Sequence, residues 1–185
     1  GDYLLSGALC LIVLMESRDM MSTISKCTER LSKGELLQAT HGFDPGISEE
    51  QYFNIISDKT ASLMASGCEV GAYLTSGSAD IAESFRKYGE FLGKAFQITD
   101  DVLDYVGDEE TIGKPTGNDA QAGTVTLPLI RALEKASPSE NAQIRGLLNG
   151  EWSDDSWPTI VDFTHKNGGI EYARFRALEY SAAAK

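Results

Sequence analysis

Residues 91–114 read FLGKAFQITDDVLDYVGDEETIGK. On a helical wheel, four oxygen-bearing side chains of this stretch fall within a sector of about 100°. They are Gln97, Asp100, Asp101 and Asp104. Apolar residues lie opposite (Phe91, Ala95, Ile98, Val102 and Tyr105) or flank the acidic stripe (Leu92, Phe96 and Leu103). A helix that is apolar on nearly every side except one stripe is predicted to be buried.

The acidic stripe is typical of a divalent-metal site that faces an internal cavity. Carboxylates inside a helical protein are costly unless they are paired or bind a metal. The spacing of Asp100, Asp101 and Asp104 places carboxylates one turn apart, near enough to share a hard cation. Mg²⁺ accepts only a few carboxylates and completes its shell with water and phosphate oxygens. A solvated acidic helix end is the alternative, and the flanking aromatics and Gln97 favour the metal site.

The composition indicates one globular domain in a reducing compartment. The chain has 185 residues, with 42% hydrophobic and 24% charged residues, enough for a sizeable core. A net charge of -12 argues against nucleic-acid binding and against attraction to an anionic membrane. The three cysteines, Cys10, Cys27 and Cys68, have neither metal-ligand nor disulfide spacing. We therefore expect a cytoplasmic protein without stable membrane insertion.

One apolar run, ALCLIVLM at residues 8–15, lies in a segment bracketed by Asp2 and Glu16. The run is too short to span a bilayer, and it lacks the basic leader of a secretory signal. We interpret it as part of a fully buried core helix.

Helical patterns follow one another along the chain, and no strand pattern, repeat or linker interrupts them. Ser48, three residues ahead of Gln51, predicts a capping box. A loop over 107–123, rich in Gly, Asp and Thr, is long enough to suggest function. We predict helices over residues 2–17, 18–38, 48–76 with a kink near 66–72, 78–105, 124–136, 138–149, 158–166 and 170–185. The fold class is all-α, with residues 1–185 as a single helical domain.

Two lysines could complement the acidic stripe. Lys59, followed by Thr60, lies mid-helix in a mostly apolar stretch, where a lysine that extends to solvent is the ordinary interpretation. Lys114 lies in the loop beyond the acidic motif, where a solvated lysine is equally ordinary. Three carboxylates for a metal and two lysines for phosphate oxygens together describe a diphosphate site.

The acidic stretch and several further strings resemble the trans-isoprenyl diphosphate synthases, or polyprenyl synthetases. Residues 93–105 resemble the second aspartate-rich motif of that family. The other matching strings follow in the family's order: GDYLL at 1–5, GELLQ at 34–38, KTA at 59–61, GK at 113–114, GND at 117–119, TLPLI at 126–130 and GGIE at 168–171. The resemblance implies an all-helical bundle of the isoprenoid synthase type around a deep cavity, and a homodimer.

The resemblance also implies a reaction, in which an allylic diphosphate is ionised and condensed with isopentenyl diphosphate. Its metal ligands would be Asp100, Asp101 and Asp104, holding Mg²⁺. Lys59 and Lys114 would contact the leaving diphosphate. Thr60 and Gln97 would face the allylic cation, with Phe96 beside the substrate.

The chain departs from the family pattern in two respects. It lacks the first aspartate-rich motif, with its Gly-Gly-Lys and arginines for isopentenyl diphosphate, and the last helix stops short of the usual family end. Members of the family commonly have a lysine two residues before the position of Thr126, and this chain has Thr124 there. We therefore expect the C-terminal part of a synthase, in which these residues alone show little or no turnover.

Two alternatives remain open. The chain could be a non-catalytic partner subunit of an active synthase, which the absent first motif and Thr124 favour. It could also belong to a terpene cyclase, although the Lys59-Thr60 and Gly113-Lys114 matches favour a chain-elongating enzyme. The length of the product is not fixed by these residues.

Overall fold

The computed structural model describes residues 2–14, 16–42, 44–106, 116–150, 153 and 155–185. The described chain is helical throughout and contains no strand, which confirms the predicted all-α class. Its elements are α1 (Asp2–Leu14), α2 (Arg18–His41), α3 (Glu49–Ile56), a π-helical turn (Ser57–Ala61), α4 (Ser62–Ser76), α5 (Ala79–Val106), α7 (Asn118–Gln121), α8 (Leu127–Lys135), α9 (Pro138–Asn149), α10 (Ser156–Lys166) and α11 (Gly169–Ala183).

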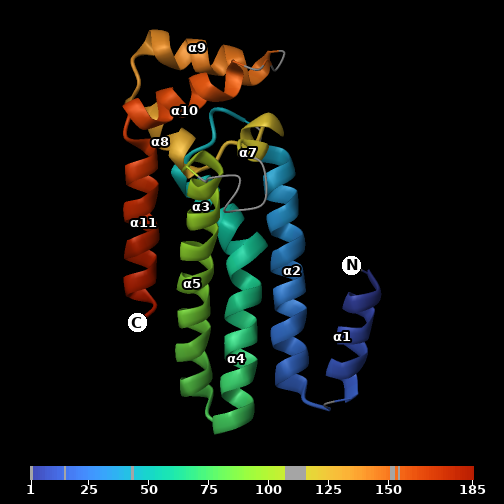
Figure 1. Ribbon diagram of the computed structural model, residues 1–185. Helices are drawn as coiled ribbons and strands as arrows, with labels where there is room; N and C mark the ends of the chain where they lie inside the picture. Colours follow the sequence, from blue (N-terminus) through green and yellow to red (C-terminus); the bar gives the residue numbers. More distant parts are fainter. Residues whose placement is uncertain (1, 15, 43, 107–115, 151–152, 154) are drawn as a thin grey trace.

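The long helices form a bundle, and the shorter ones close one end of it (Figure 1). Helix α5 packs between α4 and α11, and α2 packs against α4 and the π turn. Helices α8, α9 and α10 lie together at the end of the bundle where α5 finishes (Figure 1). The acidic end of α5 therefore meets the connection that leads through α7 to α8.

Local sequence signals set several helix ends. Ser48 and Gln51 form the predicted capping box, and Ser137 with Glu140 forms a second one at the start of α9. Gly77 ends α4 in the left-handed conformation at φ 66°, which glycine adopts without steric cost. Pro128 lies in the first turn of α8, where its missing N–H leaves no helical hydrogen bond unmade.

The core joins α5 to the capping helices. The largest fully buried side chains include Ile98 of α5, Leu129 of α8, Ile160 of α10 and Ile170 of α11. The predicted apolar side of α5 is buried at Ala95, Ile98, Val102 and Tyr105. The flanks of the acidic stripe are not buried: Leu92, Phe96 and Leu103 are 38%, 54% and 39% exposed. The prediction that α5 is a buried helix therefore holds for its apolar side and is wrong for the flanks of its acidic stripe.

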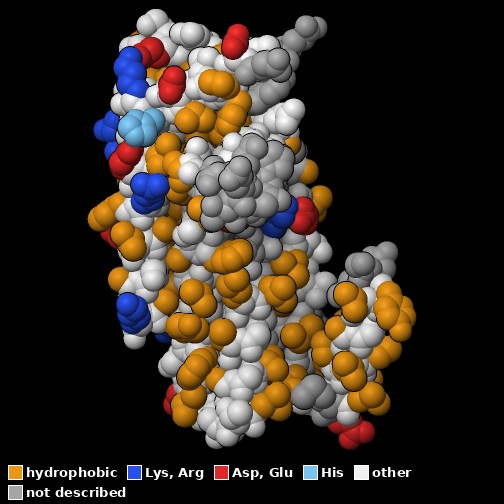
Figure 2. All heavy atoms as spheres, viewed as in Figure 1, with side chains coloured by type: hydrophobic (Ala, Val, Ile, Leu, Met, Phe, Trp, Pro, Cys, Tyr) orange, Lys and Arg blue, Asp and Glu red, His pale blue; other side chains and the backbone are white. Residues whose placement is uncertain are grey.

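The first helix is also not the buried core helix that its sequence predicts. Leu4, Leu11 and Leu14 are 76%, 65% and 77% exposed. Helix α1 lies beside the lower part of α2, apart from the rest of the bundle, and its apolar side chains cover its visible face (Figures 1 and 2). A uniformly apolar sequence makes burial favourable, but it does not determine which neighbour is available, and in the described chain the main neighbour of α1 is α2.

Other differences are shifts of helix boundaries. Helix α2 continues three residues past the predicted end, α8 begins three residues later and α10 begins two residues earlier than predicted. The kink predicted near residues 66–72 is instead a π turn at Ser57–Ala61, ahead of a regular α4. Part of the predicted loop over 107–123 forms the short helix α7.

Candidate active site

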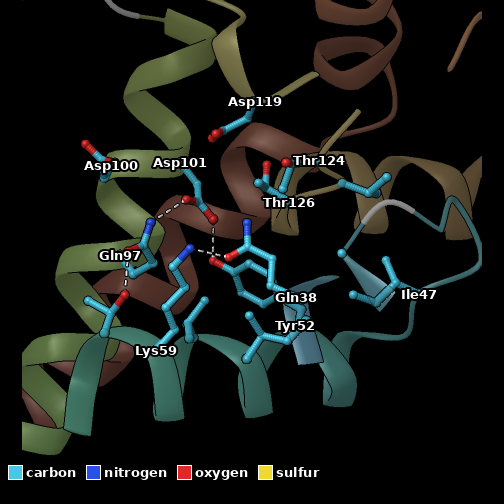
Figure 3. Close-up of a pocket in the computed structure, with 15 residues that line it drawn as sticks. Gln38, Ile47, Tyr52, Lys59, Gln97, Asp100, Asp101, Asp119, Thr124 and Thr126 are labelled. Carbon is cyan, nitrogen blue, oxygen red and sulfur yellow. Dashed lines mark hydrogen bonds between the residues drawn. The ribbon is translucent and has the colours of Figure 1, made fainter. Parts of the chain in front are cut away.

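A cavity of about 160 Å³ lies where α2, the α3–π turn segment and α5 meet the residues that precede α8. Ligand pockets for drug-sized molecules are commonly about 300–1,000 Å³, so this cavity suits a compact polar group. Figure 3 shows Lys59 and Gln38 reaching toward Asp101 from one side, with Asp119 and Thr124 on the other. The lining residues are Gln38, Gly42, Ile47, Tyr52, Ile55, Ile56, Lys59, Thr60, Gln97, Asp100, Asp101, Asp119, Thr124, Val125 and Thr126.

The π turn delivers Lys59 and Thr60 to this cavity. The Ser62 N–H donates to the carbonyl of Ser57, five residues earlier, which widens the helix by about one residue. Lys59 Nζ donates to Gln38 Oε1 at 2.6 Å and lies 3.3 Å from Glu35 Oε2. The Lys59 side chain is therefore fixed at the cavity wall, not extended into solvent.

Gln97 connects the two sides of the cavity. Its carbonyl oxygen accepts a 2.8 Å hydrogen bond from the Thr60 hydroxyl, and its Nε2 donates to Asp101 Oδ1 at 2.9 Å. The amide is thereby held in one orientation, between the π turn and the acidic helix.

Asp101 is the buried acid of the site. Its side chain is almost wholly enclosed, and its second oxygen accepts a 2.6 Å hydrogen bond from the Tyr52 hydroxyl. Burial raises the pKa of Asp101 to about 7, although the hydrogen bonds from Tyr52 and Gln97 oppose the rise. The nearby charges of Asp119 and Asp100 raise it further. A cation beside Asp101 would therefore stabilise the charged form of this carboxylate.

Asp100 and Asp119 also line the cavity, but Asp104 does not. In Figure 3, Asp119 lies beyond Asp101, on the side away from Lys59, and the Asp100 carboxylate points away from Asp101. Asp104 is buried and accepts the backbone N–H groups of Asn118 and Asp119 at 3.2 and 3.1 Å. Its carboxylate thus holds the first turn of α7, the short helix that carries Asp119.

The sequence of the chain matches a known family over most of its length. The family model described as polyprenyl synthetase matches residues 1–160. The chain belongs to the polyprenyl synthetase family. Curated relatives within the family include solanesyl-diphosphate synthase 2 of Oryza sativa, 33% identical over 97% of this chain, and octaprenyl diphosphate synthase of Escherichia coli, 30% identical over 97% of this chain. This chain spans about half the length of these polyprenyl synthetases, 43% and 55% respectively.

Solved polyprenyl synthetases share the fold. The polyprenyl synthase of Caulobacter crescentus, crystallised with calcium and isoprenyl diphosphate, has a TM-score of 0.91 and 32% identity over 99% of this chain and 56% of its own. A geranylgeranyl pyrophosphate synthase of Bacteroides thetaiotaomicron has a TM-score of 0.88 and 35% identity over 99% of this chain and 61% of its own. No helix in the described part of this polyprenyl synthetase chain is long and apolar enough to cross a membrane.

The acids of the cavity suit a hard divalent ion whose coordination is completed by other ligands. Within the described residues, no three His, Cys, Asp or Glu side chains converge closely enough to hold a metal by themselves. Asp100, Asp101 and Asp119 all line the cavity, although the Asp100 carboxylate points away from Asp101 (Figure 3). Mg²⁺ usually takes one or two carboxylates and fills its other positions with water and phosphate oxygens. The acids of this polyprenyl synthetase therefore suit Mg²⁺ that arrives together with a phosphorylated ligand.

The remaining residues predicted for the site are found in different places. Phe96 does not line the cavity; it faces a separate open groove between α5 and α11, with Leu92 and Leu178. Thr124 does line the cavity, at the position where the family resemblance leads one to expect a lysine. Lys114 lies outside the described residues.

The cavity residues that were not predicted from the sequence of this polyprenyl synthetase include Gln38, Tyr52 and Asp119. Gln38 and Asp119 lie within the strings GELLQ and GND, which carried the resemblance but suggested no role for single residues. Tyr52 gave no signal, because it lies on the apolar face of α3 and reads as an ordinary core residue. Its hydroxyl becomes important only because α3 packs beside Asp101.

Proposed function

We propose that the whole protein is a prenyltransferase that condenses an allylic diphosphate with isopentenyl diphosphate. The observation that carries this proposal is the charge pattern of the cavity. Among the described lining residues, three are carboxylates, Asp100, Asp101 and Asp119, and Lys59 is the only base. Such a cavity suits a diphosphate that is accompanied by a divalent cation.

Asp100, Asp101 and Asp104 are the proposed ligands of Mg²⁺. When bound, the ion would neutralise the diphosphate as a leaving group. Asp104 lies outside the cavity lining, and both of its oxygens accept N–H groups of α7. Its proposed part in the metal site therefore includes holding α7, which carries Asp119 to the cavity.

Lys59 binds the diphosphate in this proposal. Its ammonium lies at the cavity wall, where Gln38 and Glu35 hold it by hydrogen bond and ion pair. An ammonium group has three donors, so one remains for a phosphate oxygen. Lys114 would add a second contact from the loop after α5.

Thr60 and Gln97 face the positive charge of the allylic group. The Thr60 hydroxyl uses its hydrogen on Gln97 Oε1, so only oxygen lone pairs remain for the substrate. The Gln97 carbonyl has a second lone pair as well. Oxygen dipoles that are fixed before the substrate binds stabilise developing positive charge without reorganisation.

A prenyl-transfer assay tests the function. The complete protein, as made in its cell, is incubated with radiolabelled isopentenyl diphosphate, an allylic diphosphate primer and Mg²⁺. We expect label in an elongated product, and none when Mg²⁺ is removed with a chelator. The absence of elongated product with every allylic primer would refute the proposal. The working assembly is proposed to be a homodimer in the cytoplasm.

One observation favours a second candidate, a non-catalytic partner subunit. Thr124 lines the cavity where a lysine would add positive charge. If the complete protein is inactive alone but raises the turnover of a co-purified synthase, the second candidate replaces the first.

A further inference from the structure

The segment Ser57–Ala61 forms a π turn instead of an α-helix, and the proposed chemistry does not explain what holds it in that form. A π turn inserts about one extra residue into a helix and rotates the following side chains by about 100° relative to the preceding ones. Such turns are rare because an α-helix of the same sequence has better backbone packing. Neighbouring structure must therefore hold Ser57–Ala61 in this form.

Two helix backbones press directly against the π turn. A Cβ atom at Gly34 of α2 would lie 2.4 Å from the backbone nitrogen of Lys59. A Cβ atom at Gly93 of α5 would lie 2.5 Å from the Cα of Ala61. Both distances are far below van der Waals contact. The π turn thus lies between two glycines on opposite helices, with no space for a side chain on either.

A cluster of charges joins the same three elements. Arg30 of α2 binds Glu90 of α5 through two nitrogens, at 2.9 and 2.8 Å, and its Nε donates to Asp58 of the π turn at 2.8 Å. Lys33 adds an ion pair of 2.9 Å with Asp58. The carboxylates of Asp58 and Glu90 are only 10% and 15% exposed, so they depend on Arg30 for compensation.

Arg30 also contacts the backbone group that defines the turn. One of its terminal nitrogens donates to the carbonyl of Ser57 at 2.9 Å, and that same carbonyl accepts the Ser62 N–H of the π hydrogen bond. The Ser57 hydroxyl donates to Glu90 at 2.5 Å. The first residue of the turn is therefore held at its carbonyl and at its side chain.

We propose that Arg30 and Glu90 are positioning residues: together with the close contacts at Gly34 and Gly93, they hold Ser57–Ala61 in the π form and thereby direct Lys59 and Thr60 into the cavity. Neither Arg30 nor Glu90 lines the cavity, so they act through the turn. The structural part of this proposal stands alone, and its consequence for diphosphate binding rests on the proposed function.

If the π turn became regular α-helix, the helix on one side of the turn would have to change its position to accommodate the extra residue. Either α3 or α4 would then rotate by about 100°. Ile55 and Ile56 of α3 are buried, as are Ala61 and Ala65 beside and within α4, so both helices resist rotation. Lys59 and Thr60 would instead lose their hydrogen bonds to Gln38 and Gln97.

The test compares Arg30→Met and Glu90→Gln with the matched control Arg86→Met. Arg86 is also a helix arginine in a carboxylate pair, with Glu83, but it does not contact the π turn. The first readout is nuclear magnetic resonance of the complete protein, labelled with nitrogen-15. In the two test variants, the Lys59, Thr60 and Ser62 amides and the Gln97 side-chain amide should shift together, and the Ser62 amide should lose protection from hydrogen exchange.

In Arg86→Met these signals should stay at their wild-type positions. If Arg30→Met proves too unstable to fold, Glu90→Gln, which keeps the size of the side chain, decides the question. A folded Arg30→Met or Glu90→Gln variant with wild-type signals at all four groups would overturn the proposal.

The second readout is calorimetric binding of inorganic diphosphate with Mg²⁺, well below the melting temperature of each variant. Because Lys59 would lose its place at the cavity, we expect affinity to fall about tenfold or more in Arg30→Met and Glu90→Gln. Arg86→Met should bind as wild type does. If wild-type protein binds no diphosphate, the proposed function fails, while the resonance data still decide whether the cluster holds the turn.

Discussion

The hydroxyl of Tyr52 donates a 2.6 Å hydrogen bond to Oδ2 of Asp101, across 49 residues of sequence. The bond joins α3 to the acidic end of α5 inside the core. Because the other oxygen of Asp101 accepts from Gln97, both oxygens of this buried acid are engaged before any ligand binds. The carboxylate is thus fixed at the cavity wall by two donors from different elements.

Replacing Tyr52 by phenylalanine removes one of these donors and leaves a buried acceptor without its partner. We expect Tyr52→Phe to lower the free energy of unfolding by about 1–3 kcal/mol. Urea denaturation followed by circular dichroism measures the change. Tyr88→Phe is the matched control, because Tyr88 is 41% exposed on the same α5 face as Phe85. Equal stability of the two variants would show that the Tyr52–Asp101 hydrogen bond does not contribute to the free energy of unfolding.

Removal of the Asp104 carboxylate should loosen α7. In Asp104→Ala the N–H groups of Asn118 and Asp119 lose their charged acceptor, so their hydrogen exchange should accelerate by about 10- to 100-fold. Mass spectrometry of peptides that span residues 116–122 measures the change. Asp80→Ala, in the first turn of the same helix, should leave these peptides unchanged. Unaltered exchange in Asp104→Ala would contradict the assignment of Asp104 as the acceptor that holds α7.

Two glycine-to-alanine changes should have opposite effects on the stability of the protein. In Gly93→Ala the new methyl group meets Ala61 at 2.5 Å, and such overpacking costs about 1–3 kcal/mol. In Gly67→Ala the methyl group meets nothing within 4 Å on an exposed face of α4. The higher helix propensity of alanine should then stabilise the protein by about 0.5–1 kcal/mol. Thermal unfolding distinguishes them, and a stabilised Gly93→Ala variant would mean that α5 and the π turn are not in close contact.

Acid should weaken the charge cluster around Arg30. Burial favours the neutral carboxyl of Asp58 and of Glu90, but Arg30 acts together with other donors and charges, Lys33 at Asp58 and Ser57 and Lys94 at Glu90. Their sum outweighs burial and holds the pKa of each acid below its usual value. A lowered pKa in the folded state stabilises the protein at neutral pH, and this contribution is lost as the pH falls below about 4. Unfolding free energies from pH 6 down to pH 3 should therefore fall less steeply in Arg30→Met than in wild type.

Arg86→Met is the control for the acid series. Arg86 also lowers the pKa of its partner, Glu83, but that pair is exposed and contributes little. The acid-induced loss in Arg86→Met should therefore match wild type. If Arg30→Met shows the same loss as wild type, the cluster does not provide the acid-sensitive stability.

The sequence predicted the helices better than it predicted the contacts between them. The capping box at Ser48 and the buried side of α5 depend on local spacing, and both are present in the structure. The helical wheel placed Asp101 and Asp104 on one stripe, but a wheel gives only direction. It does not show that α7 packs against Asp104 while Tyr52 packs against Asp101.

The π turn lay beyond prediction for a related reason. Nothing in the string SDKTA at residues 57–61 distinguishes it from ordinary helix. The turn is stabilised by Arg30 and Glu90, which are distant in sequence, and by two close glycine contacts. The exposed α1 and the exposed Phe96 also depend on what packs against a helix, and an apolar pattern alone does not specify that.

Calorimetric titration of inorganic diphosphate, with and without Mg²⁺, tests the central claim most directly. Wild-type protein should bind diphosphate only when Mg²⁺ is present. Lys59→Met and Asp101→Asn should each weaken that binding by about tenfold or more, because each removes a charge-assisted contact. Asp80→Asn, on the same helix as Asp101 but far from the cavity, should bind as wild type does. Binding that is independent of Mg²⁺, or that survives both Lys59→Met and Asp101→Asn, would contradict the account.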